Sequence, residues 1–518
     1  MKIHNKILGI VSTLVVLTIV VVHAESLLAL FRPETLVWVH IRDNMLAGYI
    51  KNTLFVVMLS MFFAGIIGTL AAYFVSCFEF RFRKLINVLL HLPLAIPPYI
   101  GAFVYMDMFQ FGGLINNLTA GLLRPSSLWL AVIVFSLFLF PYVYISVKGY
   151  IGHSMSSYIE NARLLKKSEP QIFFKVIVPI AQTSISSGMI LVGLVVLGDF
   201  GVSSYLGVQT FSAAIFNSWI SFRDFDSSLR LSALVMLMVF SLLILRTLLT
   251  RYRHQGAANA RSLGVARKQL SGVAAIAPQF LLWSVIVASL GLPLYRLVSW
   301  ALLSFDSIRY TDLGVKIFNT LSTALLAALV IMILALVMGS FTRSSLGFAR
   351  ELYGKATLVS YAIPGAVLAM VVIVFFIRVE GALGISLSGG IAVLIFGFVL
   401  RYLGIGYESI ENGFKRIGMK HHEAARTLGK GYYRSLLTVD FPLLRSSIVA
   451  GFSLVLLGLL KELPLTLALR PFNFHTLGTW AYQFASDEML AHAAIPSLLI
   501  IAISALLVSA IFFNKGSV

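Results

Sequence analysis

The sequence predicts an all-α polytopic membrane protein with about 12 transmembrane helices in two tandem parallel six-helix halves. Of its 518 residues, 59% are hydrophobic and only 12% are charged, whereas about 25% are charged in an average soluble domain. The chain also contains about a dozen apolar runs that approach the roughly 20 residues needed to cross a bilayer. Short sequence markers recur about halfway along the chain, which indicates an internal repeat.

The apolar runs define the expected spans, because a backbone that crosses hydrocarbon must satisfy its own hydrogen bonds and does so as a helix. We expect spans at residues 7–29, 50–76, 85–107, 127–149, 183–203, 229–249, 273–299, 314–339, 355–377, 385–405, 443–461 and 490–513.

The distribution of charge predicts how these spans are oriented. The net charge of +19 does not indicate nucleic-acid binding, because the basic residues do not form one patch. They lie instead in alternate loops, which contain Arg81, Arg83, Lys84, Arg163, Lys166, Lys167, Lys175, Arg251, Arg253, Arg261, Arg267, Lys268, Arg343, Arg350 and Lys355. The remaining loops are poorer in basic residues and contain Asp224, Asp226, Asp306, Asp312, Asp487 and Glu488. This pattern predicts a multi-pass inner-membrane protein with both termini in the cytoplasm.

Cysteine content and the N-terminus add two smaller expectations. The single cysteine, Cys77, excludes an intramolecular disulfide and is expected to be a packing residue. The first apolar run ends in Val22-His23-Ala24, which resembles a signal-peptidase site. We expect the run to be retained, because its loss would place the remaining positive loops on the wrong side of the membrane.

The repeat divides the chain into two halves. Asn52-Thr53-Leu54 recurs 267 residues later as Asn319-Thr320-Leu321, and Glu160 and Glu423 each lie 19 residues before a proline. An even number of spans in each half keeps the copies in the same orientation, which predicts a pseudo-two-fold axis along the membrane normal. We therefore expect a first half at residues 1–250, a cytoplasmic linker at 251–272 and a second half at 273–518. The basic linker is either flexible or a lipid-headgroup-binding segment.

The last inner loop of each half contains the most specific motif. In the second half, at about residues 420–442, the sequence EAARTLGKGYYRSLLTVDFP begins at Glu423. Its first six residues favour a helix, and the small Ala424 and Ala425 allow another surface to approach closely. Gly429 and Gly431 can end that helix or turn it. A second short helix from Tyr432 to Phe441 is expected next, with Pro442 in the first turn of the following span.

This motif resembles the EAA loop of ABC importer permeases, and the resemblance extends over nearly the whole chain. It implies a type I ABC importer-like fold in which the loops couple to an ATP-binding subunit. The residues that fill the family pattern in the second half are Glu423, Ala424, Ala425, Arg426, Gly429 and Pro442. The first copy, at about residues 157–179, retains Glu160, Ala162, Arg163 and Pro179. It is degenerate, because Asn161 replaces an alanine and Lys166 replaces the glycine, and the two halves need not couple equally.

Two further segments resemble the fused permeases of the ferric iron group. They begin at Gly198 and Lys461 and read GDFGVSSYLGVQTFSAAIFNSW and KELPLTLALRPFNFHTLGTWAYQ. The resemblance implies import of ferric iron, with thiamine or another small solute as the alternative. It also implies two ATP-binding subunits and a periplasmic solute-binding protein as partners, besides membrane lipid. The binding protein is expected to dock on the outer loops, chiefly residues 204–228 and 463–489.

Missing motifs indicate that the chain is not itself an enzyme. It has no P-loop sequence, since Gly354-Lys355-Ala356 and Gly429-Lys430-Gly431 lack the required Ser or Thr. ATP and Mg²⁺ are therefore expected on the partner subunit, with no cofactor and no nucleic acid bound by this chain. We expect no metal at His421 and His422, because adjacent side chains on a helix point about 100° apart. A secondary transporter with two parallel halves is the chief alternative, but it would carry relay carboxylates deep in the bilayer.

The translocation path is predicted from matched residues at the outer ends of spans. Asp199 and Glu462 are 263 residues apart and so occupy one position of the repeat. Ionisable residues within a membrane tend to face an aqueous path, and we hypothesise that this pair meets a cationic or metal-bearing solute. The alternative is that both are interfacial charges, with Glu462 paired to Lys461. Pro97, Pro98 and Pro364 are expected to break the third span of each half, with a hinge role in gating or a role in packing only.

Overall fold

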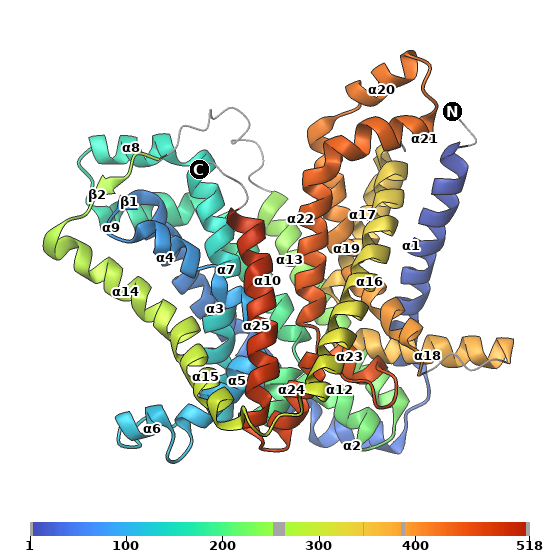
Figure 1. Ribbon diagram of the computed structural model, residues 1–518, viewed down its shortest axis with the longest axis horizontal. Coiled ribbons are helices and arrows are strands. Elements are labelled where there is room, and N and C mark those ends of the chain that lie inside the picture. The colour runs from blue at the N-terminus through green and yellow to red at the C-terminus, as the bar shows by residue number, and fades with distance from the viewer. Residues whose placement is uncertain (1–3, 252–264, 345–346, 385–388, 514–518) are drawn as a thin grey trace.

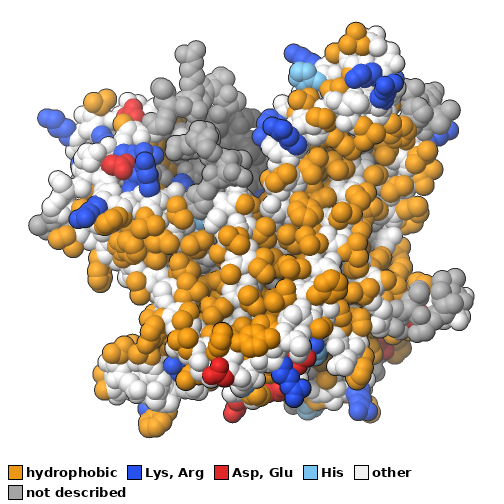
Figure 2. Space-filling model, in the orientation of Figure 1, with side chains coloured by type: hydrophobic (Ala, Val, Ile, Leu, Met, Phe, Trp, Pro, Cys, Tyr) orange, Lys and Arg blue, Asp and Glu red, His pale blue; other side chains and the backbone are white. Residues whose placement is uncertain are grey.

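The computed structural model describes residues 4–251, 265–344, 347–384 and 389–513. In these ranges, 11 helices are long and apolar enough to cross a membrane, and a bent helix pair at residues 83–118 raises the number to 12. Figure 2 shows hydrophobic side chains over the middle of the molecule, with charged side chains gathered toward its two ends. An apolar belt between two polar ends is the surface expected of a protein that spans a bilayer. The predicted all-α polytopic fold is therefore confirmed.

The first half begins with α1, whose amino end lies at the same end of the molecule as α8 (Figure 1). Its elements are α1 (His4–Leu28), η1 (Ala29–Phe31), α2 (Leu36–Asn44), α3 (Leu46–Cys77), β1 (Phe78–Glu79), α4 (Arg83–Leu89), η2 (Leu92–Ala95), α5 (Pro98–Phe109), α6 (Leu114–Leu118), α7 (Ser127–Ser154), α8 (Ser156–Leu164), α9 (Glu169–Ile172), η3 (Phe173–Ile177), α10 (Val178–Gly198), α11 (Gly201–Tyr205), α12 (Phe211–Ile220) and α13 (Phe225–Arg251).

The second half repeats this order and ends with α25, which returns to the end of the molecule where α8 and α20 lie (Figure 1). Its elements are β2 (Lys268–Gln269), η4 (Gly272–Ala275), α14 (Ile276–Ile286), η5 (Val287–Gly291), α15 (Leu292–Ser304), α16 (Tyr310–Ser344), α17 (Gly347–Ala362), α18 (Gly365–Leu383), α19 (Ile391–Ile417), α20 (Lys420–Thr427), α21 (Tyr432–Ser435), η6 (Leu436–Asp440), α22 (Phe441–Leu460), α23 (Pro464–Leu469), α24 (Leu477–Ser486) and α25 (Leu490–Phe513).

The two predicted third spans, 85–107 and 355–377, are not continuous helices. In the first half, the helical segments on either side of Ile96-Pro97 meet at 96°. In the second half, α17 ends before Ile363-Pro364, and α18 then lies across the long helices rather than alongside them (Figure 1). Both prolines have extended backbone, with ψ of 134° at Pro97 and 144° at Pro364. Proline removes a backbone donor and disfavours helix at the preceding residue, which explains both breaks.

The spans that follow the two EAA loops begin earlier than predicted. Helical structure runs without interruption over residues 169–198 and 432–460, and π-helical turns occupy Phe173–Ile177 and Leu436–Asp440. The expected separate helix from Tyr432 to Phe441 is therefore the start of the span itself. A π-helical turn shifts the hydrogen-bond register ahead of Pro179 and Pro442, where a proline nitrogen cannot donate.

The first span of each half contacts the other half. Helix α1 packs mainly against α16, α17 and α18 and also contacts α13 of its own half. The α14–α15 span contacts α3, α4 and α5, but it packs most extensively against α25 of its own half. In Figure 1 the blue α1 lies beside the yellow α16 and α17, and the yellow-green α14 lies on the outer side of the blue α4. The halves of the sequence are thus interlocked in space.

Part of the predicted linker is ordered against the first half. Residues 252–264, which include Arg253 and Arg261, lie outside the described residues. Beyond them, Lys268 and Gln269 form β2, which pairs in parallel with Phe78 and Glu79 of β1. This segment is therefore not a free tether at its second end. The buried Cys77 precedes β1 and packs in the core, as expected.

Candidate functional site

The second EAA loop forms a helix that projects from one end of the molecule (Figure 1). Helix α20 holds Glu423 and Ala424 on its exposed side, while Ala425 is buried. The helix stops at Gly429, whose φ of +85° suits a residue without Cβ. Leu428, just before this turn, is 83% exposed. The loop therefore presents an apolar tip and an acidic side chain to whatever approaches that end.

A buried ionic cluster anchors this loop to the membrane domain. His422 Nδ1 lies 2.6 Å from Asp440 Oδ2, and the guanidinium of Arg343 donates to Asp440 Oδ1 at 2.9 Å. Arg343 also donates to the carbonyl of Gly418, which ends α19. The Asp440 side chain has no solvent exposure. The cluster therefore joins α16, α19, α20 and η6 at one point, whereas the neighbouring His421 faces solvent.

The first EAA-like loop has the same shape but a different anchor. Ile159 and Ile177, 263 residues before His422 and Asp440, are both fully buried. An apolar contact layer thus replaces the ionic cluster. Ala162 is buried and Glu160 half-buried, while Leu165, the counterpart of Leu428, is 73% exposed.

The turn after each helix takes the same left-handed backbone conformation. Lys166 has a φ of +52° at the position of Gly429. Such a φ costs a residue with Cβ roughly 1–2 kcal/mol. The degenerate first copy therefore keeps the family geometry at an energetic cost that the second copy avoids.

The second end of the linker lies against the first EAA-like loop. The backbone N–H of Ala266 donates to Glu160 Oε1 at 3.3 Å, and Arg163 donates to the Ala266 carbonyl at 2.7 Å and to the Cys77 carbonyl at 3.1 Å. Lys268 lies 3.2 Å from Glu169. Two of the predicted coupling residues, Glu160 and Arg163, are therefore engaged within the chain. In the part of the chain that the structure describes, no strand lies beside α20.

A second candidate site lies between the halves, where α10 and α22 end. A cavity of about 170 Å³ is lined by residues of both halves, including Asp199, Glu462, Pro98 and Pro364. Pro97 is not among its lining residues, so the predicted path residue of the first half is replaced by its neighbour Pro98. The structure therefore brings the matched carboxylates to the lining of one cavity.

The two carboxylates make the same local hydrogen bond. Asp199 Oδ1 accepts from the backbone N–H of Val202 at 2.7 Å, and Glu462 Oε1 accepts from that of Leu465 at 3.2 Å. Each thus satisfies a donor at the start of the short helix that follows it. Glu462 has further partners, because the Tyr402 hydroxyl donates to Oε2 at 2.6 Å and Arg401 Nε lies 3.2 Å away.

The cavity also contains basic residues that the sequence analysis missed. Arg401 comes from α19, and Lys461 donates to the carbonyl of Leu94 in the first half at 2.7 Å. The suggested pair of Glu462 with Lys461 is therefore wrong, since Arg401 takes that role. A signal was present, because Arg401 is a single charge inside an apolar run, where ionisable residues are costly.

A glycine makes room for this ion pair. A Cβ on Gly365 would lie 2.5 Å from Glu462 Oε1 and 2.7 Å from Arg401 Nη1. Any larger residue would push the pair apart. The start of α18, directly after the Pro364 break, is thus in contact with the charged centre of the cavity.

The chain thus combines an interlocked helical membrane fold with two loops that project from one end and a cavity between its halves. The model of the family described as binding-protein-dependent transport system inner membrane component matches residues 64–255 and 331–514, one match in each half. The chain belongs to this family and carries its domain twice, as a double-length ABC importer permease. Membership generally implies an ATPase and a solute-binding protein as partners.

Individual relatives are similar over very different lengths. The Fe(3+)-transport system permease protein FbpB 2 of Haemophilus influenzae is 24% identical over 491 residues, which cover 93% of this chain and 90% of the relative. The sulfate transport system permease protein CysT of Salmonella typhimurium and that of Escherichia coli are each 25% identical over 171 residues. These shorter matches cover 33% of this chain and 62% of each relative. Among these three relatives, the iron permease matches both halves in one alignment, and the predicted resemblance to the ferric iron group is confirmed.

Proposed function

We propose that this chain translocates ferric iron into the cytoplasm, driven by ATP and Mg²⁺ on two copies of a separate ATP-binding subunit. A periplasmic binding protein delivers the solute to the outer loops, and both termini of the chain are cytoplasmic. The observation that carries the proposal is the pair of projecting helices α8 and α20, each followed directly by an exposed leucine, Leu165 or Leu428. An ATPase that grips both can move the two halves against each other.

The cavity suggests how a cation passes between the halves. Asp199 and Glu462 face the same space from opposite halves, but Arg401 already neutralises Glu462. A cationic solute therefore has to displace the guanidinium before it can meet both carboxylates. Movement of α18, whose first residue touches this pair, would provide that release.

The substrate is supported by the long alignment with the Fe(3+) permease. A second candidate substrate class is a small anion, because Arg401 and Lys461 both line the cavity and two shorter matches are to sulfate permeases. Thiamine or another small solute remains the further alternative within the same class of importer.

One experiment separates these possibilities. The chain is co-expressed with an ATP-binding subunit and a solute-binding protein from the same organism, and uptake of radioactive ferric iron, sulfate and thiamine is compared in proteoliposomes with and without ATP. The proposal predicts ATP-dependent iron uptake that is lost in Asp199→Asn/Glu462→Gln. ATP-dependent uptake of sulfate or thiamine instead would overturn the iron assignment, and uptake that needs no ATP would favour a secondary transporter. Normal size-exclusion behaviour of the variant shows that it has folded.

A further inference from the structure

We propose that two ion pairs of opposite polarity direct the first span of each half to the other half. The first pair joins Glu25 of α1 to Arg378 of α18, with Oε2 to Nη1 at 2.6 Å and Oε1 to Nη2 at 2.7 Å. The second joins Arg296 of α15 to Asp107 of α5, with Nε to Oδ2 at 2.7 Å. Each pair therefore connects a first span with the half-helix that follows the proline break in the opposite half.

The two pairs occupy corresponding places in the fold. Helices α5 and α18 both begin at the broken third span, and Asp107 lies 267 residues before Val374, one helical turn from Arg378. The contacts of α1 with α18 and of α15 with α5 are likewise among the contacts that the first spans make with the opposite half. The charges, however, are reversed, since the first span contributes the acid in one pair and the base in the other.

This reversal discriminates against packing of a first span on its own half. There, Glu25 of α1 would face Asp107 of α5, and Arg296 of α15 would face Arg378 of α18. Both arrangements oppose like charges. Repulsive alternatives of this kind are a general means of achieving specificity between similar surfaces. Because the two halves share a fold, α5 and α18 offer a first span similar apolar surfaces. Hydrophobic packing alone would therefore favour the opposite half only weakly.

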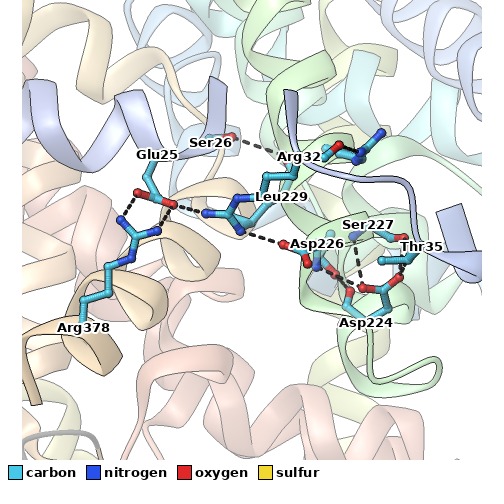
Figure 3. Close-up of polar contacts among 11 residues, drawn as sticks. Glu25, Ser26, Arg32, Thr35, Asp224, Asp226, Ser227, Leu229 and Arg378 are labelled. Carbon is cyan, nitrogen blue, oxygen red and sulfur yellow. Dashed lines mark hydrogen bonds and ion pairs between the residues drawn. The ribbon is translucent and has the colours of Figure 1, made fainter. Parts of the chain in front are cut away.

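The acidic members of the two ion pairs, Glu25 and Asp107, have few polar neighbours and are mostly buried. Figure 3 shows Glu25 between Arg378 on one side and Arg32 on the other, with Arg32 continuing to Asp226. The Glu25 side chain is only 12% exposed and that of Asp107 only 10%. Screening is weaker for such partly buried acids than for surface charges, although their basic partners are more exposed, Arg378 at 61% and Arg296 at 31%. Gln110 also reaches Asp107, at 3.4 Å, and the guanidinium of Arg296 lies over the ring of Trp300.

The test measures the position of the first spans in the intact chain. Cys77 is replaced by serine, and cysteine pairs report the contacts of the two first spans with the opposite half. Thr13 and Tyr353, whose hydroxyls lie 2.7 Å apart, report on α1 against α17. Leu70 and Pro278, which line one groove, report on α14 against α3. A short bifunctional thiol reagent then cross-links each pair in membranes, and protease cleavage in the linker makes the cross-link visible on a gel.

The double substitution Asp107→Arg/Arg378→Asp, called the stressed variant, places like charges opposite each other in both ion pairs. It leaves Glu25 bonded to Arg32. We expect both cross-link yields to fall about tenfold, because like charges that face each other across a contact repel. The matched control, Asp107→Asn/Arg378→Gln, removes the attractions without adding repulsion and should retain most of each yield. Adding Arg296→Asp to the stressed variant restores one pair and should recover only the yield at Leu70 and Pro278.

Two results would overturn the proposal. One is a stressed variant that cross-links as well as its neutral control. The other is failure of Arg296→Asp to recover its own contact while the protein remains monodisperse. If the stressed variant yields no folded protein, Asp107→Arg alone and Asp107→Arg/Arg296→Asp are compared by the amount of monodisperse protein, and the second must exceed the first. None of the four residues of the two ion pairs lines the cavity between the halves. The outcome therefore does not depend on which substrate the chain transports.

Discussion

The two EAA loops reach the same shape from different chemistry. The second loop is anchored by the buried cluster of His422, Asp440 and Arg343, whereas the first places Ile159 and Ile177 at the corresponding positions. Removing one member of a buried ionic cluster lowers the stability strongly, because the remaining charges stay buried without a partner. In an apolar layer, the loss of stability depends on how much of a side chain is removed. The comparison teaches that a projecting loop of this shape can be fixed in either way, but that its sensitivity to mutation differs.

The largest expected effect is on the ionic anchor. Asp440→Ala leaves Arg343 and His422 buried without their carboxylate, and we expect the protein to lose about 3–5 kcal/mol of stability. The measurement is the apparent Tm and the yield of monodisperse protein in detergent.

The matched control rebuilds the second anchor in the manner of the first. His422→Ile/Asp440→Ile/Arg343→Met removes all three charges together, and its stability should lie within about 1.5 kcal/mol of the unmodified chain. Ile177→Ala in the first loop should cost about 2–4 kcal/mol through the cavity that it leaves. A triple variant as unstable as Asp440→Ala would refute the idea that the cluster is replaceable by packing.

The next largest effect concerns the exposed tips. Leu428→Asp and Leu165→Asp each place a charge where an apolar contact with the ATP-binding subunit is proposed, and we expect about a tenfold loss of co-purified ATPase for Leu428→Asp. The loss for Leu165→Asp should be smaller, since Glu160 and Arg163 of that loop are already engaged with Ala266.

Both tip variants leave the anchors intact and should keep the Tm unchanged. Equal losses for the two would mean that the two loops contribute alike despite their different sequences. No loss for either would remove the support for the coupling role of α8 and α20.

A smaller effect is expected at the turn after each helix. Lys166→Gly removes the Cβ that is strained by the left-handed backbone, and it should stabilise the folded protein by up to about 1 kcal/mol. Gly429→Lys introduces the same strain and should lower the stability by about 1–2 kcal/mol. Thermal unfolding of the two variants, and of the double exchange, checks the opposite signs. Lys166→Ala, which retains Cβ, is the control and should not reproduce the gain.

The smallest effect is expected at Asp224, a position where the halves also differ. Burial alone would raise the pKa of the Asp224 carboxyl, but hydrogen bonds from Ser227, Thr35 and Asp226 outweigh it and lower the pKa. Because the pKa is lower in the folded state, the carboxylate stabilises the folded protein at pH values above its unfolded-state pKa. This contribution to stability is lost as the pH falls through the folded-state pKa. Asp224→Asn should therefore lower the Tm at pH 7, and the difference should shrink below about pH 4.

The control for this change is Asp487→Asn. Asp487 lies 263 residues after Asp224, but at the end of α24 rather than at the start of a helix. A pH-independent effect of Asp224→Asn would mean that its hydrogen bonds do not favour the charged carboxylate.

The sequence determined the class of fold and the repeat, because both depend on local properties. Apolar runs of the right length specify helices that satisfy their own backbone in lipid, and Glu160 and Glu423 identify the two loops at a fixed distance from a proline. The pairing of Asp199 with Glu462 also followed from spacing alone, and the cavity between the halves contains both.

Tertiary structure decided which charges meet and which half each helix joins. Arg401 reaches the cavity from a position that no repeat or motif marks, and Lys461 donates to the first half rather than pairing with the adjacent Glu462. Helix α1 lies against the second half. This contact joins segments that are far apart in the sequence, so it depends on packing and on charges that meet only when the chain folds. Periodicity and spacing describe neighbours along the chain, whereas the partners of Glu25, Asp440 and Glu462 are 353, 97 and 60 residues away.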